Sequence, residues 1–244
     1  MLIDSHIHLG RTEKSKRFFT PQSCLDLMDR CEVDGAIVMP NLSNLTTFSE
    51  LNSEFIGGLN GYDRLYPFLL IDCNDPEVKD QITQYRDVIK GVKFHPSISQ
   101  VVLSDASMEP ILDVVSELGL PVLVHCGRHR KSSICYVIET AEKYENLTFI
   151  AAHLGGNAND LIEIALRLLL QAQLDNVYLD TSACKSPWLI ERAVEVLGSD
   201  KILYGSDEPY SDMRISKYCC ELADLAVEVK SKIYSENVRG IIHV

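Results

Sequence analysis

The stretch PVLVHCGRHRKSSICYVIETAEKYENLTFIAAHLGG, residues 121–156, carries the pattern on which the fold prediction rests. Two short apolar runs, Pro121–His125 and Leu147–His153, have the length and composition of buried strands, and each ends in a histidine. Between the two runs, apolar residues recur at the spacing of one helix face: Val137, Ile138 and Ala141. A strand, a helix and a second strand in this order predict two parallel strands joined by a crossover helix.

The alternation of apolar runs and amphipathic segments continues on both sides of this stretch. The other runs with strand character are Leu2–His8, Gly35–Met39, Leu65–Ile71, Ile89–His95, Val177–Thr181 and Lys201–Ser206. Helix starts are indicated where a capping residue precedes a proline, at Thr20-Pro21, Asp75-Pro76 and Ser186-Pro187. Eight strands that alternate with helices predict a single (β/α)8 TIM barrel over residues 1–244, with Glu228–Val244 helical and packed across it. An open doubly wound sheet is the alternative, but no G-x-G-x-x-G loop follows the first strand.

The composition is that of an ordinary globular protein, with 46% hydrophobic and 24% charged residues. The net charge of −12 repels phosphate backbones and anionic membrane surfaces, so the expected partner is a small molecule rather than nucleic acid or a membrane. The eight cysteines include no C-x-x-C pair, and there is neither a signal-peptide pattern nor an apolar run of about 18 residues. These features predict a cytoplasmic protein with reduced thiols. A homo-oligomer, in which a neighbouring subunit completes the pocket, is a further hypothesis.

Polar residues collect at the carboxyl ends of the predicted strands, where barrel enzymes carry their active sites. These residues are His6, His8, Lys93, His95, His125, His153 and Asp207. Side chains alternate between the two faces of a strand, so we expect His6 and His8 on one face and Ile3 and Ile7 on the other. Each residue alone also has a structural interpretation, such as a helix cap for Asp207 or a solvent-reaching side chain for Lys93. Their convergence on one rim favours a functional site.

Imidazole and carboxylate donors without thiolates suit Zn²⁺, Mn²⁺ or Fe²⁺. Three or four protein ligands that leave one position open are typical of a catalytic metal. Such a metal lowers the pKa of bound water from about 15.7 towards about 7, which makes hydroxide available at neutral pH. Asp207 is predicted to take up and return the proton of that water.

The whole set of residues resembles the amidohydrolase superfamily of metal-dependent barrels, which carries H-x-H on the first strand, histidines ending the fifth and sixth, and an aspartate ending the eighth. The segments that look most like its amidohydrolase-2 branch are GVKFHP (91–96), VLVHCG (122–127), AAHLGG (151–156), LYGSDEPY (203–210) and the closing SENVRGII (235–242). That branch includes hydrolases and decarboxylases similar to aminocarboxymuconate semialdehyde decarboxylase.

The resemblance implies that a divalent metal is held by His6, His8, His125 and Asp207. His153 would orient or deprotonate water beside one metal, or ligate a second metal. Zn²⁺ is the expected ion, with Mn²⁺ or Fe²⁺ as alternatives, and we favour one ion over two. In binuclear relatives the fourth strand supplies a carboxylated lysine or a glutamate, so Lys93 is either carboxylated or a cation that holds a substrate carboxylate or phosphate.

The leading hypothesis is therefore a metal-dependent hydrolase of the amidohydrolase type, in which metal-activated water attacks an ester, lactone, amide or imide bond of a small, anionic molecule. Lys93, His95 and Arg128 are the predicted substrate-binding residues, although the basic loop 128–131 also has the character of a solvated charged run. Non-oxidative decarboxylation at the same metal is the alternative. A TatD-like nuclease, which carries a glutamate in place of GVKFHP, and a non-catalytic barrel are minor alternatives.

Overall fold

The computed structural model describes residues 1–11, 18–41 and 47–244, and its strands form one sheet with the order β2-β1-β3-β4-β5-β6-β7-β8-β9. The strands are β1 (Ile3–Arg11), β2 (Phe18–Phe19), β3 (Gly35–Pro40), β4 (Leu65–Ile71), β5 (Gly91–Phe94), β6 (Val122–Val124), β7 (Phe149–Ala151), β8 (Val177–Asp180) and β9 (Ile202–Leu203). All eight predicted strands are present, most of them shorter than predicted. The additional strand β2 pairs antiparallel with β1, and all other neighbours are parallel.

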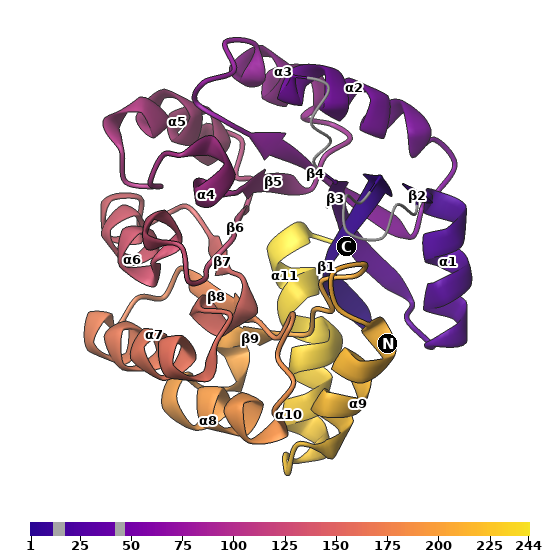
Figure 1. Ribbon diagram of the computed structural model, residues 1–244, viewed down its shortest axis with the longest axis vertical. Helices are drawn as coiled ribbons and strands as arrows, with labels where there is room; N and C mark the ends of the chain where they lie inside the picture. The colour runs from indigo at the N-terminus through magenta and orange to yellow at the C-terminus, as the bar shows by residue number, and fades with distance from the viewer. Residues whose placement is uncertain (12–17, 42–46) are drawn as a thin grey trace.

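The sheet is curled, and helices surround it on the outside (Figure 1). Between the first and last parallel strands, the described residues show one isolated parallel bridge, Ile7 with Glu208. Single backbone hydrogen bonds accompany the bridge: the N–H of Ser5 donates to the carbonyl of Tyr204 at 2.9 Å, and the N–H of Asp207 donates to the carbonyl of His6 at 2.8 Å. The molecule therefore has an α/β fold with a curled, mostly parallel sheet whose two ends meet near β1.

The helices follow the strands as the alternation predicts. They are α1 (Pro21–Arg30), α2 (Phe48–Gly58), α3 (Val78–Tyr85), α4 (Pro96–Ser99), α5 (Glu109–Glu117), α6 (Ile134–Lys143), α7 (Asn159–Ala172), α8 (Pro187–Leu197), α9 (Met213–Leu222), α10 (Val227–Ser231) and α11 (Asn237–Ile242). Thr20 caps α1, as predicted, and Ser23 completes a capping box with it, whereas α3 begins two residues after Pro76. None of the helices in the described part of the chain combines the length and the apolar character of a bilayer-crossing segment.

Along β3, β6 and β7, neighbouring residues alternate between two apolar clusters. The larger cluster lies between the sheet and the surrounding helices and includes Val122 and Val124 of β6. The smaller cluster lies on the inner face and includes Leu123. Val238, Ile241 and Ile242 of the closing helical segment join this inner cluster, which confirms that the C-terminal segment packs across the sheet (Figure 1).

The prediction that Ile3 and Ile7 share one face was wrong. Ile3 belongs to the inner cluster, and Ile7 belongs to the outer one. The cause is a β-bulge, because the register with β3 shifts between Asp4 and Ile7. The carboxylate of Asp4 supports the bulge by accepting a hydrogen bond from the N–H of His6 at 3.0 Å. The bulge turns the side chain of Ile3 towards the inner face, and His6 and His8, which follow it, stay close together.

Candidate metal centre and its cavity

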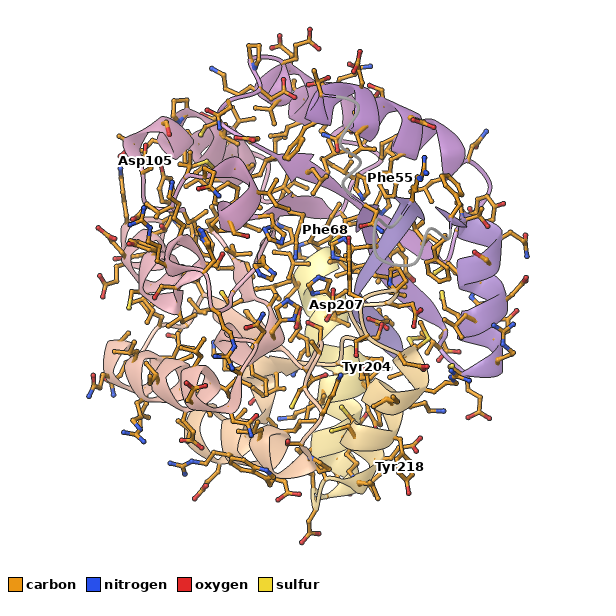
Figure 2. The ribbon with its side chains drawn as sticks, in the orientation of Figure 1. Phe55, Phe68, Asp105, Tyr204, Asp207 and Tyr218 are labelled. Carbon is orange, nitrogen blue, oxygen red and sulfur yellow. The ribbon has the colours of Figure 1, made fainter. Side chains whose placement is uncertain are left out.

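Three ligand-type side chains converge where β1 meets the segment after β9. His6 Nε2 lies 3.2 Å from His8 Nε2 and 3.6 Å from Asp207 Oδ1, and His8 Nε2 lies 3.5 Å from the same oxygen. One ligand atom from each of the three residues lies within 4.8 Å of the others. Figure 2 shows Asp207 in the middle of the ring of strands. The predicted meeting of the first and eighth strand ends is therefore present.

The two imidazoles are prepared to act as neutral ligands. Burial is the main cause that lowers the pKa of both His6 and His8 well below its usual value, and Lys93 and the neighbouring imidazoles add to it. Asp180 Oδ2 lies 2.8 Å from His6 Nδ1, and the His8 ring is hydrogen-bonded to the backbone of Pro40. A partner on one ring nitrogen fixes the tautomer and directs the lone pair of the other nitrogen, which for His6 also lies 3.1 Å from Lys93 Nζ, towards the space where a metal would bind. The donor set and its orientation fit a divalent metal.

Asp180 and Ser182 were not predicted, and both support the centre. Asp180 Oδ1 accepts from the N–H of His153 at 2.8 Å and from the N–H of Ser182 at 3.0 Å. Ser182 Oγ lies 2.8 Å from His153 Nδ1 and 3.1 Å from His6 Nδ1. Asp180 ends β8, so the strand-end rule that selected Asp207 was also able to select Asp180. His6, His153 and Asp180 form a second group with ligand atoms within 4.8 Å, but the 2.8 Å contact inside it is that of a hydrogen bond.

The other predicted histidines line up beside this group. His153 Nε2 lies 3.1 Å from His125 Nδ1, and the His95 ring stacks on the His125 ring with centroids 3.9 Å apart. His125 belongs to neither of the two compact groups found among the described residues. Burial, more than any other cause, lowers the pKa of His95 to about 3 and that of His153 to about 4. These rings are therefore neutral near pH 7.

Lys93 lies inside the sheet next to the metal-type ligands. Its side chain is buried, and Nζ lies 3.1 Å from His6 Nε2. Burial lowers the pKa of Lys93 to about 8, while the negative charges of Asp180 and Asp207 oppose the shift. The ammonium thus provides the centre with a positive charge whose proton is held more weakly than that of an exposed lysine.

A cavity of about 300 Å³ opens above these residues. Its lining includes the predicted residues His8, Lys93, His95, His125, His153 and Asp207. Arg128 is exposed and is not among the lining residues, so its role in substrate binding stays a prediction. The backbone φ angles of His153 and Asp207 are 60° and 65°, an uncommon region for residues other than glycine that recurs at functional sites.

The chain belongs to the amidohydrolase family, because the family model Amidohydro_2, described as amidohydrolase, matches residues 55–239. The resemblance seen in the sequence is thereby confirmed. No curated protein matches the chain.

Solved structures share the fold over the full length of the chain. A 5-carboxyvanillate decarboxylase from Sphingomonas paucimobilis is 14% identical, with a TM-score of 0.76 and coverage of 100% of this chain and 99% of that chain. A dihydroxybenzoic acid decarboxylase from Polaromonas, with bound manganese and 2-nitroresorcinol, is 15% identical, with a TM-score of 0.79 and coverage of 99% and 96%. A probable 2-pyrone-4,6-dicarboxylic acid hydrolase from Acinetobacter baumannii, with citric acid bound, is 15% identical, with a TM-score of 0.74 and coverage of 100% and 99%. These similarities show the fold; the family and the His and Asp cluster support a metal-dependent enzyme, without selecting zinc or hydrolysis.

Proposed function

We propose that this chain is a metal-dependent enzyme that removes CO₂ from a small carboxylic acid without oxidation. The observation that carries the proposal is the convergence of His6, His8 and Asp207 beside the buried cation Lys93 in one cavity. Decarboxylases with this fold, described as acting on 5-carboxyvanillate and dihydroxybenzoic acid, add support for this reaction over the hydrolysis that the sequence favours. The reaction converts R–COO⁻ and H⁺ into R–H and CO₂, so the site must hold a carboxylate and deliver one proton.

The residues of the cavity suit both tasks. When bound by His6, His8 and Asp207, with His125 as the further ligand that the family resemblance implies, a divalent metal would act as a Lewis acid that stabilises negative charge on the substrate. Lys93 would attract an oxygen of the substrate, because it is the buried ammonium beside the cluster.

A proton at the reacting carbon requires a donor on the cavity wall. Asp207 lines the cavity and is the residue that we propose to carry this proton. His153 is neutral, Ser182 holds its Nδ1 side, and its Nε2 lies 3.1 Å from His125 Nδ1, so a proton exchange with Asp207 or with water would require this last contact to open.

Hydrolysis of a lactone or ester is the second candidate, because a probable pyrone dicarboxylate hydrolase shares the fold over nearly its full length. The same residues would then direct water to a carbonyl carbon. The two reactions differ in their products, since only hydrolysis places an oxygen atom of water in the product.

For the metal, we propose Mn²⁺ or Zn²⁺, since the nitrogen and oxygen donors suit either ion and a decarboxylase with this fold binds manganese. For the fold, we interpret the curled sheet as a closed (β/α)8 barrel. The hydrogen bonds from Ser5 and Asp207 across the gap support this interpretation.

The experiment is a product analysis on chain loaded separately with Mn²⁺ and Zn²⁺. The substrates are 2,6-dihydroxybenzoate, 5-carboxyvanillate and 2-pyrone-4,6-dicarboxylate, in ¹⁸O-labelled water and in D₂O. Decarboxylation predicts labelled CO₂ from a ¹³C carboxyl group and one deuterium at the carbon that carried it. One ¹⁸O atom in the product without CO₂ would instead establish hydrolysis and overturn the proposal.

A further inference from the structure

A second cavity lies beside the candidate metal centre, and the proposed reaction does not use it. It measures about 250 Å³, and most of its exposed lining is apolar. Its lining includes the apolar side chains of Leu9, Phe18, Phe19, Leu51 and Phe55, with Arg11 and Glu54 as its charged members. They come from the end of β1, from β2 and from one face of α2, on which Figure 2 labels Phe55. The cavity is therefore built to accept an apolar group.

Pro40 and Asn41 line both cavities, so they form the ridge between them. This ridge is attached to a proposed metal ligand, because the backbone of Pro40 is hydrogen-bonded to the His8 ring. Tyr210 packs edge-on against the same ring, with centroids 5.4 Å apart and planes at 83°, and its hydroxyl donates to Asn41 Oδ1. The ridge thus has a fixed position relative to the site of reaction.

Asn41 carries a donor that the described part of the protein does not satisfy. The residue is 2% exposed, and its Nδ2 has no hydrogen-bond partner among the described residues. Tyr210 holds the oxygen side of the amide, so the nitrogen side remains for another acceptor. A buried donor without a partner is unfavourable and uncommon in native structures. Because Asn41 lines both cavities, a ligand that crosses from one to the other is a candidate source of this acceptor.

We propose that the two cavities form one substrate site for a carboxylic acid that bears an apolar substituent. The carboxylate end lies beside His6, His8 and Lys93, and the substituent, a short alkyl chain or a ring, fills the second cavity. Asn41 Nδ2 donates to an oxygen of the substrate where the molecule crosses the ridge. This inference rests on the proposed function for the position of the acid group, and it adds the chemical class of the rest of the substrate.

The test measures binding to the Mn²⁺-loaded chain by calorimetry, with 2,6-dihydroxybenzoate as the parent and its 3-propyl and 4-propyl derivatives. Removing a propyl group from water is favourable, so one derivative is expected to bind at least about tenfold more tightly than the parent. Gly58 lines the second cavity and Gly57 does not, and a Cβ at either position meets no atom within 4 Å. Gly58→Phe should therefore remove the preference for propyl, and Gly57→Phe, the matched control in the same helix, should keep it.

A second variant tests the ridge. Asn41→Asp preserves the shape and the acceptor for Tyr210 but replaces the unsatisfied donor with a carboxylate oxygen, so we expect at least about tenfold weaker binding of the preferred derivative. Undiminished binding would show that Asn41 Nδ2 does not donate to the substrate.

The remaining outcomes separate the two proposals. If no derivative binds more tightly than the parent, or if Gly57→Phe and Gly58→Phe lose the preference equally, the shared site is wrong even where CO₂ is released. A propyl preference lost only in Gly58→Phe, in a chain that releases no CO₂, would support the shared site and overturn the reaction.

Discussion

Two regions share the inner side of the curled sheet, and they are built in opposite ways. One is the inner apolar cluster, in which Phe68 and Leu203 pack against Val238 of the C-terminal helix. The other is the metal centre, in which His6 and Lys93 are equally buried but polar. Strand β1 supplies Ile3 to the first region and His6 to the second, so side chains rather than the backbone distinguish the two.

The difference separates stability from chemistry. Burial of apolar side chains favours the folded state, and packing makes each of them costly to remove. Burial of His6 and Lys93 instead opposes their charged forms, as their lowered pKa values show. Hydrogen bonds orient these polar groups at some cost in stability, as expected of a site arranged for function. Changes in the polar region should therefore reduce activity, and changes in the apolar region should reduce stability.

The largest effect is expected for Asp207→Asn. The substitution removes the negative charge from the group that also contains His6 and His8, and with it the proposed proton carrier. We expect turnover to fall by about 10³-fold or more, within the range reported for the loss of an acid–base group together with a ligand. The midpoint of thermal unfolding of the metal-free chain should change little.

The matched control is Asp175→Asn, which changes a fully exposed aspartate. This variant should keep both turnover and the unfolding midpoint. The comparison between the two regions breaks down if Asp207→Asn keeps its activity, or if it unfolds like a core variant.

The next effect is expected for Phe68→Ala in the apolar cluster, which should reduce stability rather than metal binding. Phe68 is fully buried, and its ring occupies the space beside Gly91, where an added Cβ would lie 2.4 Å from the ring. Its truncation should lower the free energy of unfolding by about 3–5 kcal/mol, measured by urea denaturation. Metal affinity at a temperature where the chain is folded should be retained. Tyr218→Ala, an exposed aromatic truncation on α9, should cost far less.

The two regions differ in how much of their structure could be predicted from the sequence. The alternation of apolar runs predicted every parallel strand, because the outer face and the inner face of each strand are both buried. The same patterns predicted that the C-terminal segment covers the sheet. They did not predict the bulge in β1, because the polar residues Asp4, Ser5 and His6 interrupt the apolar pattern in which an inserted residue would be seen.

In the polar region, the strand-end rule found His6, His8 and Asp207, whose positions follow from topology alone. It missed Asp180, whose role depends on a 2.8 Å contact with His6 across the sheet. It also missed Asn41, since an asparagine after a strand has no distinctive pattern and becomes notable only when its donor proves to be buried without a partner. The identity of the acid that binds depends on such contacts, so no pattern in the chain names it.

A smaller effect is expected for Asp180→Asn, which tests whether this carboxylate orients the His6 ring in the polar region. The amide would present N–H to His6 Nδ1 and favour the tautomer that carries its proton on Nε2, the atom that faces His8. Loss of such an orienting carboxylate typically weakens metal binding by about 10–100-fold. Titration of Mn²⁺ against a chelator measures the change. Ser182→Ala removes a hydroxyl that contacts the same ring and keeps the carboxylate, so it should weaken binding less; equal affinities in all three chains would contradict the proposed orientation.

The last effect concerns pH and the buried, neutral imidazole of His153. Burial lowers the pKa of His153 from 6.5 to about 4, so between these values the unfolded chain binds a proton that the folded chain does not. The free energy of unfolding contributed by this group therefore falls as the pH is lowered from 6.5 to 4, by at most about 1.4 kcal/mol per pH unit. Asp4 acts in the opposite sense, because burial raises its pKa from 3.8 to about 7 and the folded chain then holds the extra proton. His153→Gln keeps Asp4 and removes the imidazole, so urea denaturation of both chains in a chelating buffer isolates the histidine. We expect the native chain to lose more stability than the variant across this range, and parallel curves would show that His153 is not held neutral by burial.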